Sequence, residues 1–323
     1  MTALLEVRGL KTHFDTRAGV IKAVDGIDLS LQPGEVMGLV GESGSGKSVA
    51  SFSILGLIDP PGEIVAGEIL FRGEDLRTAS PVRLKELRGK DIAMVFQDPM
   101  MTLTPVLKVE TQMVETIHAH ERVSAKAARA RAVDVLRRVG SSDPETRIRA
   151  YPHQFSGGMR VAIAIALLHT PALILADEPT TALGVTIQGQ IIAEIQKLVA
   201  ETGAAMVWVS HDLAVVETIA DTISVMYAGR IVEQGPAGAV IGAPAHPYTE
   251  GLLNSIPSRT TPGQRLNQIP GMAPSVLNLP AGCPFVPRCS YANAACNTPV
   301  APRAAGPERS VRCTAPLTRE AAQ

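Results

Sequence analysis

The sequence has no apolar run that approaches the roughly 18 to 20 residues needed to span a bilayer. Its first residues, 1–8, lack the basic, apolar and small-residue sections of a signal peptide. Charge is nearly balanced, with 30 Lys and Arg against 31 Asp and Glu, so the net charge is −1. Neither a basic block nor interleaved aromatic residues suggest a groove for nucleic acid. We therefore expect a cytosolic protein that does not bind nucleic acid and contacts membranes only through partners.

Cysteine is absent from the first 282 residues, and all four cysteines follow in a proline-rich tail, at Cys283, Cys289, Cys296 and Cys313. Because disulfides are disfavoured in a reducing cytosol, a metal centre is the leading explanation of this confinement. Four thiolates suit either a Zn²⁺ ion or an iron–sulfur cluster. The C-x2-4-C pairs usual in zinc sites are missing, which favours the cluster. Four unligated thiols are the third alternative.

A glycine-rich segment matches the pattern G-x-x-x-x-G-K-[ST] between an expected buried strand, residues 35–40, and an expected helix, residues 49–56. Its glycines let successive backbone N–H groups face a phosphate, and the helix N-terminus adds partial positive charge. A lysine in this position bridges the β- and γ-phosphates, and the next hydroxyl ligates Mg²⁺. The segment is therefore predicted to be a phosphate-binding P-loop. Its predicted nucleotide-binding residues are Gly41, Ser43, Gly44, Ser45, Gly46, Lys47 and Ser48.

A second nucleotide-binding pattern lies farther along the chain, where the apolar run 172–176 ends in Asp177 and Glu178. Asp177, at the end of a buried strand, can hold Mg²⁺ through water. Glu178 is then placed to accept a proton from the water that attacks the γ-phosphate. The alternative is an acidic strand end that caps a helix. Beside a P-loop, the nucleotide site is the better explanation.

With these two patterns and three further motifs, the chain resembles the ATPase subunits of ABC transporters. Ser156, Gly157 and Gly158 match that family's signature, whose hydroxyl and N–H groups approach the γ-phosphate of an ATP held by the other subunit. Gln97 matches the Q-loop, which reaches Mg²⁺, and His211 matches the switch histidine near the γ-phosphate. The resemblance implies a dimer that sandwiches two ATP molecules.

The same resemblance completes the set of predicted site residues. The predicted catalytic residues are Glu178, His211 and Gln97, and the Mg²⁺ ligands are Ser48, Gln97 and Asp177. Phe14 is the candidate for stacking on adenine.

The resemblance narrows to the ATPases of oligopeptide and dipeptide importers, on residues 155–160, 226–233 and 246–249 and on the tail. In dipeptide-importer ATPases the tail that resembles residues 282–289 holds a [4Fe–4S] cluster. The implied partners are a second ATPase subunit, expected to differ from this chain, two transmembrane permease subunits and, indirectly, an extracytoplasmic solute-binding protein. The implied location is the cytoplasmic face of the membrane. Importers of nickel and other small solutes share much of this pattern.

The fold class expected from alternating strands and helices is α/β, a P-loop NTPase layer structure. As the resemblance has it, this is a RecA-like ABC ATPase core, residues 1–97 and 169–235, with a helical subdomain at 98–168. A proline- and cysteine-rich C-terminal extension, 236–323, carries 14 of the 24 prolines and is expected to be loop-rich. Because the ATPase motifs are complete without the tail, we expect its cluster to brace the extension against a neighbouring subunit.

Two departures from the family pattern touch the catalytic interface. Where the family continues Met-Arg-Gln-Arg, Arg160 is followed directly by Val161, and the loss of two residues rotates the helix beyond it by about 200°. Gly184 stands where the family's D-loop ends in Asp. The main hypothesis is an importer ATPase, and the second is a hydrolysis-impaired half of an asymmetric dimer. A soluble ABC protein acting on ribosomes or DNA fits poorly with near-neutral charge and no coiled-coil insertion.

Overall fold

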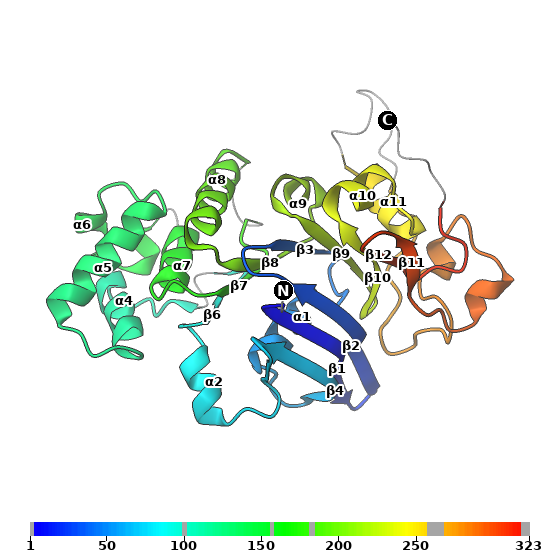
Figure 1. The fold of residues 1–323 in the computed structure, drawn as a ribbon, viewed down its shortest axis with the longest axis horizontal. Coiled ribbons are helices and arrows are strands. Elements are labelled where there is room, and N and C mark those ends of the chain that lie inside the picture. Colours follow the sequence, from blue (N-terminus) through cyan, green and yellow to red (C-terminus); the bar gives the residue numbers. More distant parts are fainter. Residues whose placement is uncertain (1–2, 99–101, 156–157, 181–184, 257–267, 318–323) are drawn as a thin grey trace. The chain divides into compact units, whose positions relative to one another are not determined.

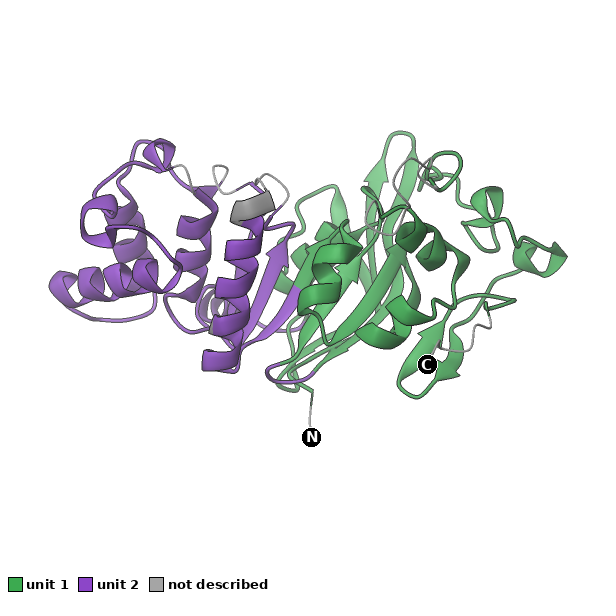
Figure 2. Ribbon diagram, turned by 90° about the horizontal axis from the view of Figure 1, so that it is seen from above, with its two compact units in different colours: residues 1–31, 35–77, 208–323 green, residues 32–34, 78–207 purple. Residues whose placement is uncertain are grey.

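Figure 1 shows the chain as a computed structural model that describes residues 3–98, 102–155, 158–180, 185–256 and 268–317. It divides into two compact units (Figure 2). Unit 1 comprises residues 1–31, 35–77 and 208–323, and unit 2 comprises residues 32–34 and 78–207. The three-part division expected from the sequence stays a prediction.

Unit 1 contains an antiparallel sheet in the order β2-β1-β4-β5. Its strands are β1 (Leu5–Thr16), β2 (Gly19–Leu31), β4 (Gly62–Phe71) and β5 (Glu74–Asp75). In β1 the buried positions are odd-numbered before a bulge, at Leu5 and Val7, and even-numbered after it, at Leu10 and Thr12. The extra residue of the bulge shifts the alternation of side chains by one position. Thr12 then meets Ser53 of α1 (Lys47–Leu55), with 2.7 Å between the two hydroxyl oxygens, so the sheet supports the P-loop helix.

Unit 1 also contains a run of strands in the order β11-β12-β10-β9-β3. They are β3 (Val36–Val40), β9 (Thr222–Tyr227), β10 (Arg230–Pro236), β11 (Arg303–Gly306) and β12 (Arg309–Val311). β3 and β9 pair in parallel, as the predicted α/β layer requires. α9 (Leu213–Ile219) packs on β3 so closely that a Cβ atom at Gly38 would lie 2.1 Å from Val216.

The C-terminal extension is more helical than its proline content predicts. α10 (Ala237–Gly242) and α11 (Pro247–Asn254) precede the 3-10 turns Val286–Arg288 and Ala294–Asn297. Pro247 occupies the first turn of α11, where no N–H bond is needed, and the His246 ring accepts a hydrogen bond from the Tyr248 N–H. Proline therefore begins this helix, and the expectation of a loop-rich segment is wrong for residues 237–254.

Unit 2 holds the parallel pair β6 (Ile92–Val95) and β7 (Leu173–Asp177) and a set of helices. The helices are α2 (Pro81–Leu87), α4 (Val109–His118), α5 (Ala125–Arg138), α6 (Pro144–Arg147), α7 (Gly158–Leu167) and α8 (Val185–Thr202). β8 (Ala205–Ser210) passes from unit 2 to unit 1 after Val207. In the ranges that the structure describes, no helix combines the length and apolarity needed to cross a membrane.

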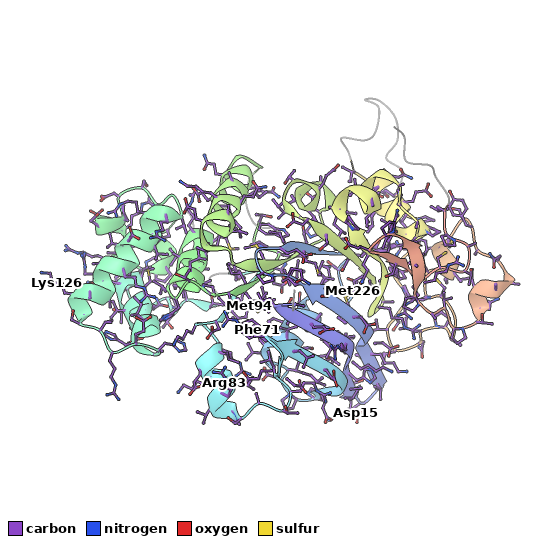
Figure 3. The ribbon with its side chains drawn as sticks, in the orientation of Figure 1. Asp15, Phe71, Arg83, Met94, Lys126 and Met226 are labelled. Carbon is purple, nitrogen blue, oxygen red and sulfur yellow. The ribbon has the colours of Figure 1, made fainter. Side chains whose placement is uncertain are left out.

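α5 confirms the predicted helix near residues 124–139. The Ser124 hydroxyl caps it by accepting a hydrogen bond from the Ala127 N–H at 3.2 Å. Ala128, Ala132 and Leu136 recur every fourth residue and are fully buried. The polar face is exposed, as Lys126 shows in Figure 3.

Candidate nucleotide site and cysteine cavity

The P-loop joins β3 to α1, and two of its glycines are required by close backbone contacts. A Cβ atom at Gly41 would lie 2.2 Å from the carbonyl oxygen of Met226, and one at Gly46 would lie 2.1 Å from that of Ala23. Gly46 also has a φ of +106°, which residues with a side chain rarely adopt. A larger residue at either position would push the loop away from β2 and β9.

Lys47 turns its side chain back over the loop. Its Nζ donates hydrogen bonds to the carbonyl oxygens of Gly41, at 2.8 Å, and of Glu42, at 3.0 Å. The residue is only 5% exposed. Among the described residues the buried Ser45 hydroxyl has no hydrogen-bond partner. The fixed ammonium of Lys47 and the unused hydroxyl of Ser45, beside glycine backbone, fit a bound phosphate. Ser48, the predicted Mg²⁺ ligand, is the next residue after Lys47.

The acidic residues lie in unit 2, at the carboxyl end of β7, which pairs in parallel with β6. Asp177 ends β7 and is 4% exposed. Glu178 follows with a φ of +46°, a left-handed backbone that costs energy in residues other than glycine and is often found at functional sites. Gln97 follows β6, and its Nε2 donates a hydrogen bond to Glu178 Oε2 at 3.2 Å. The structure therefore brings Gln97 and Glu178 together.

His211 and Phe14 lie in unit 1, apart along the chain from the acidic residues. His211 is exposed and directly follows β8. Phe14 is half-buried on β1 and packs against Gly62, where a Cβ atom would lie 2.5 Å from the ring. The predicted roles of both residues stay predictions.

The signature and the D-loop fall largely outside the described residues, namely at Ser156, Gly157 and Gly184. Gly158 begins α7, and the Arg160 guanidinium donates a hydrogen bond to Gln190 Oε1 of α8 at 3.0 Å. The side chains of 161–164 are buried. The cavity between α7, α8 and the strands is about 10 Å³, about the space of one water. α7 therefore packs closely without the two residues that the family pattern adds.

The four cysteines line one cavity in unit 1, together with His246. All four are free cysteines. Burial raises the pKa of the Cys283, Cys289 and Cys313 thiols, and the neighbouring thiols raise these pKa values further.

His246 is 1% exposed, and in the described structure its Nε2 has no hydrogen-bond partner. Burial lowers the pKa of its imidazole to about 3, so the ring is neutral. No group of three or more His, Cys, Asp or Glu in the described ranges is arranged to hold a metal ion. The iron–sulfur and zinc hypotheses both stay predictions.

A contact between the extension and the P-loop was not expected from the sequence. Arg288, directly before Cys289, is 7% exposed and forms an ion pair with Glu42, the second residue of the P-loop. The two residues are 246 positions apart, so no local pattern indicates their contact. The carboxylate of Glu42 inside a phosphate-binding loop is a signal that could have suggested a cation nearby, because a cation offsets its charge.

Comparisons with known proteins agree with this geometry. A family profile described as "ABC transporter" matches residues 24–181, and one described as "Oligopeptide/dipeptide transporter, C-terminal region" matches residues 232–296. A peptide import ATP-binding protein of Brucella melitensis is 48% identical over 315 residues, 93% of each chain. The dipeptide transport ATP-binding protein DppD of Escherichia coli is 47% identical over 296 residues, 91% of this chain and 90% of its own.

Solved structures share the fold. The ATP-binding cassette MJ0796, a dimer in a post-hydrolysis state bound to ADP and Pi, aligns with a TM-score of 0.65 and 27% identity, over 72% of this chain and 98% of its own. CbiO1 of Clostridium perfringens, part of an ABC transporter complex, aligns with a TM-score of 0.62 and 27% identity, over 74% of this chain and 91% of its own. The predicted P-loop α/β fold is confirmed, and the chain belongs to the ABC transporter family, among the ATP-binding proteins of oligopeptide and dipeptide transport.

Proposed function

We propose that this chain binds and hydrolyses ATP to drive the import of oligopeptides or dipeptides. The observation that carries the ATPase activity is the P-loop itself, in which Lys47 is fixed by two loop carbonyls and Ser45 keeps an unused hydroxyl. Peptides as the substrate class follow from relatives named for peptide transport over nearly the whole chain. Peptide uptake into vesicles that hold the permeases, with and without ATP, tests both statements.

In the proposed mechanism Lys47 binds the β- and γ-phosphates, and Glu178 accepts a proton from the attacking water. Ser48, Gln97 and Asp177 would hold Mg²⁺, which neutralises the charge that develops on the phosphates. The hydrogen bond from Gln97 supports this role of Glu178, because it orients the carboxylate. His211 would contact the γ-phosphate.

The subunit works with transmembrane permeases. In our proposal it lies on the cytoplasmic face of the membrane, beside a second and different ATPase subunit. Ser156, Gly157 and Gly158 would then face the ATP of that partner. An extracytoplasmic solute-binding protein would deliver the peptide to the permeases. The relatives described above are named for peptide or dipeptide transport, which favours peptides over nickel, a ribosome or DNA as the target.

The two departures from the family pattern, after Arg160 and at Gly184, predict a lowered ATPase activity that can be restored. Insertion of Gln-Arg after Arg160, together with Gly184→Asp, is expected to raise ATPase activity in the assembled complex, because the other motif residues are present. The measurement is phosphate release with permeases and partner subunit. Equal rates before and after the repair would mean that this chain accommodates both changes; for the missing pair after Arg160, the close packing of α7 allows this.

We also propose that the tail cysteines hold a [4Fe–4S] cluster, with one Zn²⁺ ion as the alternative. Four thiols around one cavity support the donor set, and the unused His246 Nε2 adds a polar group to its wall. The cluster would be structural and would brace the extension.

Anaerobic purification is expected to give brown protein that absorbs at about 400 nm and carries about four irons per chain. Cys289→Ser should bleach it, because the variant lacks one of four ligands, while ATP binding that depends on Lys47 persists. Thr298→Ser, a control on the same tail away from the cavity wall, should stay brown. Colourless protein with one zinc per chain would favour the alternative, and metal-free protein with four titratable thiols would reject both.

A further inference from the structure

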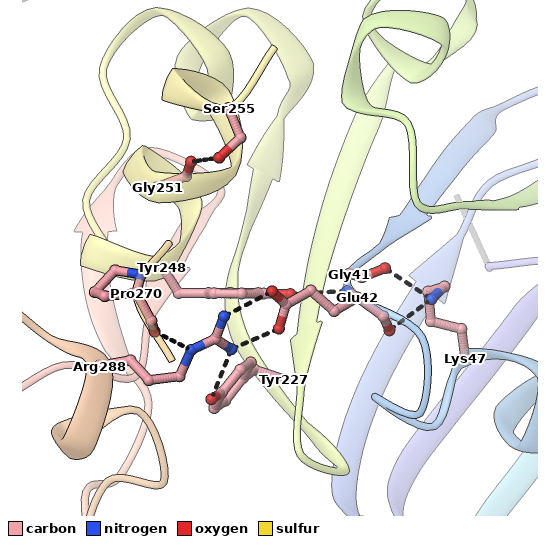
Figure 4. A network of polar contacts seen from close by, with 9 residues as sticks. All are labelled: Gly41, Glu42, Lys47, Tyr227, Tyr248, Gly251, Ser255, Pro270 and Arg288. Atoms are coloured by element: carbon pink, nitrogen blue, oxygen red, sulfur yellow. Dashed lines mark hydrogen bonds and ion pairs between the residues drawn. The ribbon is translucent and has the colours of Figure 1, made fainter. Parts of the chain in front are cut away.

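Arg288 connects the cysteine-bearing tail to the P-loop through its two terminal guanidinium nitrogens, and its third nitrogen bonds within the tail (Figure 4). Nη1 and Nη2 donate to the two carboxylate oxygens of Glu42, at 2.6 and 2.9 Å. Nη1 also reaches the Tyr227 hydroxyl at 3.3 Å, and Nε donates to the Pro270 carbonyl oxygen at 2.9 Å. This is the bidentate geometry in which arginine binds a carboxylate most strongly.

Glu42 is held at its backbone as well as at its side chain. Its N–H donates to the Tyr248 hydroxyl at 2.8 Å, and its carbonyl oxygen accepts from Lys47 Nζ at 3.0 Å. The rings of Tyr227, Tyr248 and Phe285 pack behind this contact, with centroids 4.5 to 5.4 Å apart. The extension therefore fixes the residue that in turn bonds to the phosphate-binding lysine.

The charges explain why this contact matters for nucleotide binding. Glu42 places a negative charge within the loop that must accept the negative phosphates. Its side chain is 31% exposed, whereas the Arg288 side chain is 5% exposed and delivers its charge from the protein interior. Without Arg288 the carboxylate would repel the phosphates and be free to turn toward them.

We propose that Arg288 is a positioning residue for ATP binding: the tail neutralises Glu42 and holds the P-loop backbone in its phosphate-binding conformation. The inference rests on the proposed ATPase function. It makes the C-terminal extension a determinant of nucleotide affinity, a role beyond that of a brace.

The test measures the affinity of the full chain for a fluorescent ATP analogue. Arg288→Gln should weaken binding by about tenfold or more at low salt, because an unpaired charge now opposes the phosphates. Raising the ionic strength should shrink this loss, since salt screens a partly exposed charge. The double variant Glu42→Gln, Arg288→Gln should recover most of the affinity, because it removes the repelling charge as well.

Arg312→Gln is the matched control. Arg312 also directly precedes a cysteine of the tail, but its guanidinium bonds to the carbonyl oxygens of Ile231 and Val300. It should bind the analogue as the parent does. Thermal unfolding of each variant shows whether it is folded.

The outcomes separate the inference from the function on which it rests. Parent-like binding by folded Arg288→Gln, an equal loss in Arg312→Gln, or a double variant as weak as the single one would overturn the inference. If the parent itself bound no analogue, the proposed ATPase function would fail instead.

Discussion

Replacement of Lys47 by alanine is expected to abolish tight ATP binding. The Lys47 ammonium is the buried positive charge of the loop, and the glycine backbone alone cannot neutralise the phosphates. Its two hydrogen bonds to the Gly41 and Glu42 carbonyls hold the charge in place before it meets a phosphate. Titration of the purified chain with a fluorescent ATP analogue measures the loss.

Lys197→Ala is the control for this variant. Lys197 lies on α8 with a side chain that is 77% exposed, so its loss should leave the affinity unchanged. A melting curve distinguishes lost binding from lost fold, because the Lys47 change also frees two loop carbonyls. If a folded Lys47→Ala chain bound the analogue as well as the parent, the assignment of the P-loop would be wrong.

The nucleotide-binding elements were predictable from the sequence because their chemistry is local. The spacing of Gly41, Gly46 and Lys47 predicts a strand, a loop and a helix, and β3 and α1 appear at those positions. The close contacts of Gly41 and Gly46 with β9 and β2 explain why glycine is needed there. The bond between Gln97 and Glu178 agrees with two separate motif assignments, although neither motif predicts that bond.

The extension was less predictable, for two physical reasons. Proline stops a helix in its interior but begins one in its first turn, and its frequency alone does not distinguish these cases. Pro247 is the second kind. The pair of Arg288 and Glu42 depends on the folding of distant segments onto each other, and such contacts leave no periodic signal.

Replacement of Glu178 by glutamine is expected to preserve ATP binding and to slow hydrolysis by at least about 10²-fold, the usual scale for the loss of a general base. Glutamine keeps the size of the side chain, and its carbonyl oxygen can still accept the hydrogen bond from Gln97 Nε2. Its amide cannot take the proton of the attacking water.

The measurement compares single-turnover phosphate release with the affinity for the ATP analogue, so that chemistry and binding are separated. The same substitution at Glu201, which is 55% exposed on α8, should change neither quantity. A rate that stays at the parent's value in Glu178→Gln would remove Glu178 from the mechanism. A joint loss of affinity and rate would instead assign it to nucleotide binding, because a general base acts only after ATP is bound.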